Sequence, residues 1–251
     1  MMNIDYWQTF SEGAYYHIYN RAIGNDLLFL SHDNYQFFLK KYQLYMGNYV
    51  DTIAFCLMSN HYHFIIRPKI VDKAFLESAQ QEQSIVAKRF VHCMQAEVSD
   101  ALKASDTYIS YDDFLVDQFK RLFNSYSAAF NKQQNRTGSL FQRKFKRIQL
   151  TSVPRLLNRI CYVHHNPIHH DMSPFYDSWR YSSYNIYMSK SPSQLARDLG
   201  LSLFAPLSDA PKTPEAYYAE AIKDFSDRHE QFHIEWVKNQ RVSDIDDIEG
   251  E

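Results

Sequence analysis

The sequence has few glycines and cysteines and no long apolar run. Among its 251 residues are 6 glycines and 3 cysteines, Cys56, Cys93 and Cys161, with no CxxC pair. This pattern argues against a disulfide framework and predicts free thiols in a reducing compartment. No apolar stretch approaches the roughly 18 residues of a membrane span, and the first residues do not resemble a signal peptide. We therefore expect a cytoplasmic protein without a membrane partner.

The overall composition indicates a folded globular protein. Hydrophobic residues make up 45% of the chain and charged residues 22%, with 19 tyrosines and 18 phenylalanines. A chain of this length can form one large domain, or one domain with a substantial appendage. Taken globally, the net charge of −2 argues against a nucleic-acid partner.

Acidic residues are missing from one long segment, between Gln118 and His170. That segment carries ten of the 27 basic residues, so the remainder holds 17 basic against 29 acidic side chains. The ten are Lys120, Arg121, Lys132, Arg136, Arg143, Lys144, Lys146, Arg147, Arg155 and Arg159. A basic block of this size is typical of a nucleic-acid surface, although it can also be a solvated face.

Aromatic residues are interleaved with these cations. They are Phe119, Phe123, Tyr126, Phe130, Phe141 and Phe145. Rings beside cations can stack on the bases of single-stranded nucleic acid, but packing in a core is the commoner use of an aromatic side chain. The pattern therefore leaves both interpretations open.

The order of predicted elements indicates an α+β fold. Strand patterns cover residues 14–20, 50–57 and 61–67, and residues 140–150 read as a basic extended segment. Helical patterns cover 33–45, 82–103, 118–134, 152–167 and 215–238, with Ser31 and Ser152 as caps and Pro167 as the end of its helix. This order predicts a ferredoxin-like antiparallel sheet covered by helices.

Two regions complete the domain organisation. Residues 1–190 form the main predicted domain. Residues 191–251 contain four prolines and one helical pattern, so we expect a C-terminal helical extension that ends in an acidic tail.

His61 and His63 lie two residues apart in a predicted strand. Side chains at this spacing point to the same face, and two imidazoles on one face can bind a divalent ion. The strand is otherwise apolar, so two polar rings on it need an explanation. An isolated pair of this kind is more often a pair of ordinary surface residues.

Tyr162 and Asn166 lie four residues apart in a predicted helix and share a face. Tyr162 can instead pack in the core, and Asn166 can simply end the helix before Pro167. Four further histidines are His164, His165, His169 and His170. They could form a metal cluster, but their spacing matches no zinc motif.

Five segments together resemble a known family. They are HIYNR (17–21), FCLMSNHYHFIIRP (55–68), RTGSLFQRKFK (136–146), YVHHNP (162–167) and WRYSSY (179–184). In this order they resemble the single-tyrosine transposases of the HUH nuclease superfamily, and most closely the REP-associated tyrosine transposases, relatives of the insertion-sequence-200 transposases. The resemblance spans about residues 10–187.

The resemblance implies a function and a set of site residues. It implies that His61, His63 and Asn166 hold Mg²⁺ or Mn²⁺, and that Tyr162 attacks single-stranded or hairpin DNA to form a 5′-phosphotyrosine link. The strands are then rejoined. Expected DNA contacts are Arg143, Lys144, Lys146 and Arg147, followed by Lys120 and Arg121.

Some features depart from the family, and other functions remain open. Residues 69–117 form a longer insertion than compact members need, and the region beyond 190 has no counterpart. The alternatives are a domesticated nuclease that processes chromosomal repeats, a catalytically silent nucleic-acid-binding module, and a phosphodiesterase or RNA-processing enzyme. Both a monomer and a homodimer are compatible with the resemblance.

Overall fold

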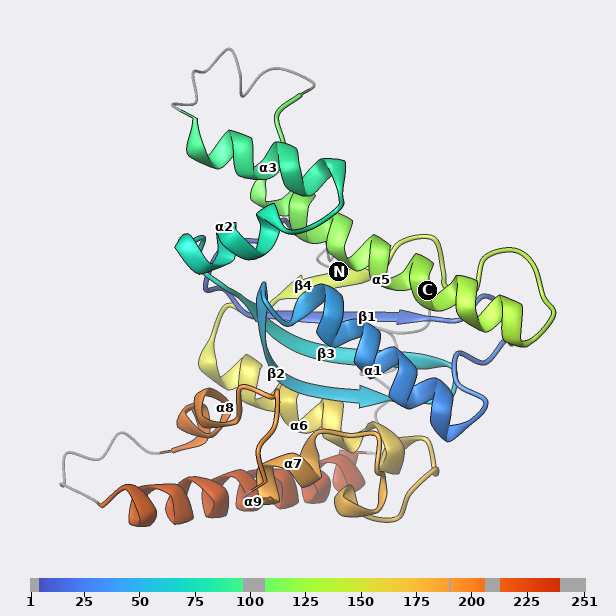
Figure 1. Ribbon diagram of the computed structural model, residues 1–251. Helices are drawn as coiled ribbons and strands as arrows, with labels where there is room; N and C mark the ends of the chain where they lie inside the picture. Colours follow the sequence, from blue (N-terminus) through green and yellow to red (C-terminus); the bar gives the residue numbers. More distant parts are fainter. Residues whose placement is uncertain (1–4, 97–106, 190, 206–212, 240–251) are drawn as a thin grey trace.

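The computed structural model describes residues 5–96, 107–189, 191–205 and 213–239, so the acidic tail lies outside the described residues. Its centre is an antiparallel four-stranded sheet with the order β2-β3-β1-β4 (Figure 1). The strands are β1 (Tyr16–Arg21), β2 (Val50–Leu57), β3 (His61–Pro68) and β4 (Lys146–Gln149). The predicted ferredoxin-like α+β class is confirmed, while the basic segment 140–150 forms a strand only at its end.

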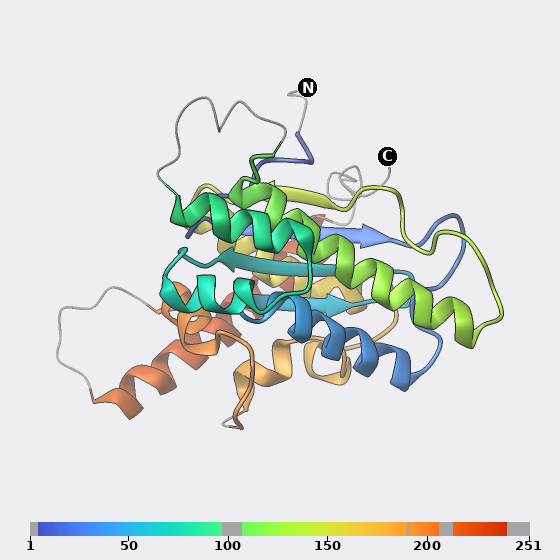
Figure 2. The same cartoon turned by 45° about the horizontal axis from the view of Figure 1, so that its top comes forward.

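Two helices cover one face of the sheet, α1 (His32–Met46) and α5 (Tyr111–Gln133) (Figures 1 and 2). The Ser31 hydroxyl caps α1 as predicted by accepting from the Asn34 amide, and a capping box with Ser110 begins α5 earlier than expected. Alternate residues of β3, such as Tyr62 and Phe64, point into the core beneath these helices.

The stretch between β3 and α5 forms two short helices, α2 (Lys73–Gln80) and α3 (Ile85–Gln95). The single helix predicted over 82–103 is shorter where the structure describes it. Ser84 is the N-cap of α3 and its side chain accepts from the Ala87 amide, so the helix cannot begin at Glu82. Residues 97–103 of that prediction lie outside the described residues.

The opposite face of the sheet is covered by α6 (Val153–His169) (Figure 1). The segments η1 (Tyr176–Ser178), α7 (Tyr184–Met188), α8 (Arg197–Phe204) and α9 (Pro214–Asn239) follow it. Phe225 of α9 and Phe204 of α8 share one buried cluster with Ile160 of α6 and Ile65 of β3. The predicted C-terminal extension is therefore helical, and it contributes to the core behind the sheet.

Helix α6 continues beyond Pro167, so the prediction that this proline ends the helix is wrong. Proline lacks an N–H group, and one main-chain hydrogen bond is lost inside the helix. The chain continues because the His170 amide donates to the Asn166 carbonyl, and the Met172 amide donates to the Pro167 carbonyl. This continuation brings the His170 ring to 5.2 Å from the His61 ring, measured between centroids.

The aromatic residues of the basic segment are mostly core residues. Five of the six are less than 10% exposed, and Phe145 is partly buried against the same cluster. Packing in the core therefore accounts for these rings. No helix in the described part of the chain is both long and apolar enough to cross a membrane.

Candidate active site

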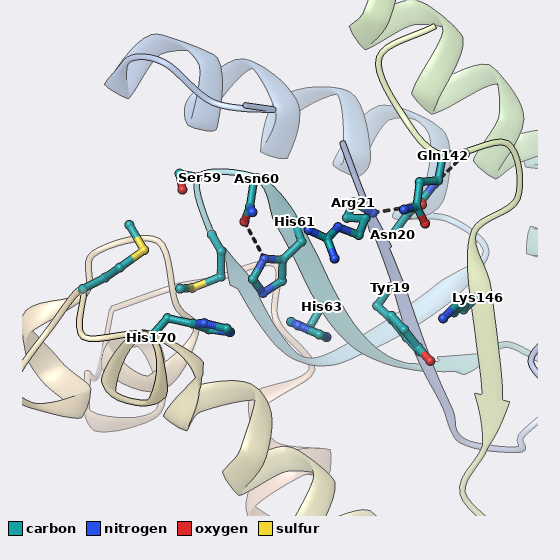
Figure 3. A pocket seen from close by; sticks show the side chains of 12 residues that line it. Tyr19, Asn20, Arg21, Ser59, Asn60, His61, His63, Gln142, Lys146 and His170 are labelled. Carbon is teal, nitrogen blue, oxygen red and sulfur yellow. Dashed lines mark hydrogen bonds between the residues drawn. The ribbon is translucent and has the colours of Figure 1, made fainter. Parts of the chain in front are cut away.

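A pocket of about 350 Å³ lies where β1 and β3 meet the end of α6. Figure 3 shows side chains from both strands, from β4 and from the end of α6 around one space. The ionisable side chains that line it are Tyr19, Arg21, His61, His63, Lys146 and His170. Carboxylates are absent from the lining that the structure describes, so the pocket suits an anionic ligand.

His61 and His63 project from the same face of β3, as their spacing predicts. Their ring centroids lie 5.0 Å apart and the rings are nearly perpendicular. Nδ1 of His61 lies 2.7 Å from Oδ1 of Asn60, which can only accept. The proton of a neutral His61 ring therefore sits on Nδ1, and Nε2 carries a lone pair.

Asn166 brings a second lone pair to the same point. Its Nδ2 donates to the Tyr162 carbonyl at 3.0 Å, which turns Oδ1 toward His61. Oδ1 then lies 3.3 Å from Nε2 of His61. Two acceptors that face each other are favourable only with a proton or a metal ion between them. The donor set of two imidazoles and one amide oxygen therefore fits a divalent cation.

Acidic ligands do not supplement this set. Within the described residues, no group of three His, Cys, Asp or Glu side chains has an arrangement that could hold a metal. A metal ion at this pocket would therefore need the Asn166 amide as its third ligand, which leaves most of the positive charge of the ion uncompensated.

Tyr162 lies beside the histidines within the same chain. Its ring meets His63 edge-on, with 5.8 Å between centroids, and the Arg159 guanidinium lies 4.9 Å from the Tyr162 ring centre. The side chain is 4% exposed and does not line the pocket. The phenol ring is thus buried next to His63, outside the pocket lining.

The sequence patterns assign no role to Tyr19 and Arg21, which line the pocket. Tyr19 pairs with His63 across β1 and β3 and with Lys146 across β1 and β4, so these three form one row over the sheet. Arg21 lies opposite His61 in the same register, and the His170 ring lies 5.2 Å from His61. Strand alternation in HIYNR could have placed Tyr19 and Arg21, whereas His170 depends on the continuation of α6.

The predicted DNA contacts separate into two groups. Lys146 lines the pocket, and Lys120, Arg143 and Lys144 are exposed around a second cavity of about 730 Å³. The two cavities adjoin, since Asn20 and Gln142 line both.

The second group is already engaged with carboxylates. Arg121 pairs with Glu82 at 2.8 Å, and Arg147 pairs with Asp112 at 2.7 Å. By contrast, the guanidinium of Arg21 makes no hydrogen bond or ion pair with any described residue. Arg21 therefore offers charge to a ligand more readily than either paired arginine does.

Histidines on the other side of α6 do not reach the pocket. Nδ1 of His164 lies 2.8 Å from Nε2 of His229, and Nε2 of His164 lies 2.7 Å from the Ser183 hydroxyl. Nε2 of His165 lies 3.0 Å from Nδ1 of His233. Burial lowers the pKa of His165 and of His229 to about 3 and holds that of His164 well below its usual value. These rings are neutral and fasten α9 to α6.

The sheet order, the helices on both faces and the histidine strand define a ferredoxin-like protein with a candidate phosphate-binding pocket. The solved structure of a REP-associated tyrosine transposase bound to a REP hairpin is similar to this chain, with a TM-score of 0.51 and 10% sequence identity. The match covers 76% of this chain and 89% of that chain. At this identity it shows a shared fold. No protein-family model matches the sequence, and no curated protein matches it either.

Proposed function

We propose that this protein is a metal-dependent enzyme that cuts and rejoins single-stranded or hairpin DNA through a covalent bond to Tyr162. The observation that carries the proposal is the meeting of His61, His63, Asn166 and Tyr162 in one chain, behind a cationic pocket. The similar fold of a transposase solved with a REP hairpin supports the choice of DNA as substrate.

The reaction is a phosphoryl transfer between two oxygens. The Tyr162 hydroxyl attacks phosphorus, and the bond from phosphorus to the 3′-oxygen breaks. The phenol loses its proton, and the departing 3′-oxygen takes up a proton to become a hydroxyl. The products are a 5′-phosphotyrosine link and a free 3′-hydroxyl. Because the new bond keeps the energy of the old one, a 3′-hydroxyl can reverse the step and join strands.

A bound Mg²⁺ or Mn²⁺ would polarise the scissile phosphate and neutralise charge that develops on its oxygens. His61, His63 and Asn166 are the residues that would hold it. Arg21 and Lys146 flank the histidines across the sheet and would bind the phosphate oxygens on either side. These two cations thus orient the phosphate for attack.

The strand would continue past the pocket into the neighbouring cavity. Lys120, Arg143 and Lys144 around that cavity are placed to neutralise the adjoining backbone phosphates. We assign no DNA contact to Arg121 and Arg147, because their charges are already paired. All site residues come from one chain, so the site can be complete in a monomer.

Covalent trapping tests the proposal. Single-stranded hairpin DNA labelled on the 5′-phosphate side is incubated with Mn²⁺, and a protein–DNA adduct is sought on a denaturing gel. We expect an adduct with the wild type and none with Tyr162→Phe. Tyr218→Phe is the matched control, because the hydroxyl of Tyr218 is buried without a hydrogen-bond partner in the described residues, and it should form the adduct normally.

Three outcomes would contradict the proposal. A wild-type protein that retards DNA without forming an adduct would be a silent binding module. Cleavage of RNA with DNA left intact would indicate an RNA-processing enzyme. An undiminished adduct in Tyr162→Phe would place the nucleophile elsewhere.

A further inference from the structure

A third imidazole contacts the histidine pair from the neighbouring strand. Nε2 of His17 lies 2.9 Å from Nδ1 of His63, and the two rings are stacked with 5.1 Å between centroids. Antiparallel pairing of β1 with β3 sets Tyr19 opposite His63, so His17 reaches His63 along the diagonal. Both histidines are 1% exposed.

The contact decides which nitrogen of His63 can bind a metal ion. Nδ1 of His63 is used by His17, so a cation at the pocket would bind Nε2, which must then be unprotonated. The proton of His63 has to sit on Nδ1 and be donated to Nε2 of His17. His17 must therefore be neutral, with its own proton on Nδ1.

Other rings enclose His17, which is 1% exposed. Its ring lies 4.7 Å from that of Tyr19 and 6.4 Å from that of Tyr162. A neutral imidazole can accept the proton of His63, which a charged imidazolium could not.

Fold stability does not explain an imidazole at this position. Nδ1 of His17 is buried and has no hydrogen-bond partner among the described residues, and such an atom destabilises the folded state. An apolar side chain of similar volume would fill the same space without this cost. On the other side of the ring, Nε2 of His17 is hydrogen-bonded to His63.

We propose that His17 is a positioning residue that fixes the ring orientation and the tautomer of His63, so that Nε2 of His63 is presented to a divalent cation. Metal-binding histidines commonly donate their other ring N–H to an acceptor that fixes the tautomer and the ring orientation, and here an imidazole is that acceptor. The inference rests on the proposed function, because it takes His63 as a metal ligand. It adds a residue of β1 to the proposed metal-binding residues, which otherwise come from β3 and α6.

Mn²⁺ binding to the metal-free protein, without DNA, tests the proposal. Free Mn²⁺ is followed by electron paramagnetic resonance during a titration of His17→Leu and His17→Gln. Leucine keeps the bulk but cannot accept, so we expect its Mn²⁺ affinity to fall about 10- to 100-fold. The Gln amide oxygen can lie where Nε2 of His17 lies, so His17→Gln should bind within about threefold of the wild type.

His229→Leu is the matched control. His229 is also buried and also contacts another histidine, His164, at 2.8 Å, but it belongs to the opposite side of α6. Its Mn²⁺ affinity should equal that of the wild type. Wild-type affinity in His17→Leu, or equal losses in the Leu and Gln variants, would overturn the role of His17 as an acceptor.

A second measurement does not depend on the variants. Long-range proton–nitrogen NMR of the wild type with Mg²⁺ should show His63 protonated at Nδ1, and the opposite tautomer would overturn the inference. The proposed function fails separately: it fails if the wild type forms no adduct and His61→Ala leaves Mn²⁺ affinity unchanged. If His61→Ala loses binding while His17→Leu keeps it, only the role of His17 is refuted.

Discussion

Two groups of histidines lie on opposite sides of helix α6. The spacing of their rings is similar, but their surroundings differ. The pocket histidines are His61, His63 and His170. The interior histidines are His164, His165 and His229. Both groups contain rings about 5 Å apart, so spacing alone does not tell them apart.

The difference lies in what the ring nitrogens face. In the interior group, both nitrogens of His164 and both nitrogens of His229 have partners, including the Ser183 hydroxyl and the Phe225 carbonyl. In the pocket group, Nε2 of His61 faces another acceptor, Oδ1 of Asn166. Nδ1 of His165 is buried without a hydrogen-bond partner among the described residues, but His165 does not line the pocket. The fully paired rings of His164 and His229 hold helices together, whereas converging lone pairs beside a cavity indicate a place for a cation.

The largest effect is expected from removing a pocket histidine. We expect His61→Ala to slow adduct formation about 1,000-fold, or about 4 kcal/mol, because the charge on the phosphate oxygens is no longer compensated. The ring is partly exposed, so the free energy of unfolding should change by only about 0.5 kcal/mol. Single-turnover gels and urea unfolding measure the two quantities, and a large loss of stability would place His61 with the interior group.

The opposite result is expected for an interior histidine. His229→Ala removes a buried ring and leaves Nδ1 of His164 without its partner, so the free energy of unfolding should fall by about 2 to 3 kcal/mol. Adduct formation per folded molecule should stay within about twofold of the wild type. A metal-dependent loss of activity in this variant would erase the distinction between the groups.

Acid should act on the interior group through linkage. The interior rings have folded-state pKa values lowered by burial, to about 3 for His165 and His229. The unfolded chain therefore binds more protons below about pH 6.5, and stability falls as the pH is lowered from there toward about 3. Each ring contributes at most about 1.4 kcal/mol per pH unit. Urea unfolding between pH 7 and pH 4 should show a smaller slope in His229→Ala than in the wild type.

The smallest effects are expected at the cations. Lys146→Gln should weaken DNA binding a few-fold and reduce the salt dependence of the affinity by about 0.7 of a logarithmic slope unit, the value for one phosphate contact with a single strand. Arg147→Gln should leave that slope unchanged, because Arg147 is bound to Asp112. Fluorescence anisotropy with a labelled single strand at several salt concentrations measures both variants, and equal slopes would contradict the assignment.

Local patterns were sufficient to predict the sheet and part of the site. Period-two alternation predicts that His61 and His63 share one face of β3. The helical period predicts that Tyr162 and Asn166 share one side of α6, where Nδ2 of Asn166 donates to the Tyr162 carbonyl. These relations depend on neighbours within one element, and sequence spacing describes them directly.

Relations between distant segments could not be predicted in the same way. The contact of His17 with His63 depends on the register of two strands, and the pairing of Arg121 with Glu82 depends on how α5 packs beside α2 and α3. The continuation of α6 past Pro167 depends on carbonyl partners supplied by the turn that follows. Each is decided by tertiary packing, which overrides a local pattern.

The enclosure of Tyr162 has a thermodynamic consequence. Tyr162 is 4% exposed and does not line the pocket. The proposed reaction therefore requires a second state, in which the hydroxyl faces the pocket. If that state makes up about 1% of molecules, the apparent affinity for the cleavable strand is about 100-fold below its intrinsic value. DNA that stabilises the exposed phenol would recover this factor, and DNA that binds both states equally would not. Selectivity for the substrate would then act on the population of the nucleophile before any bond is broken.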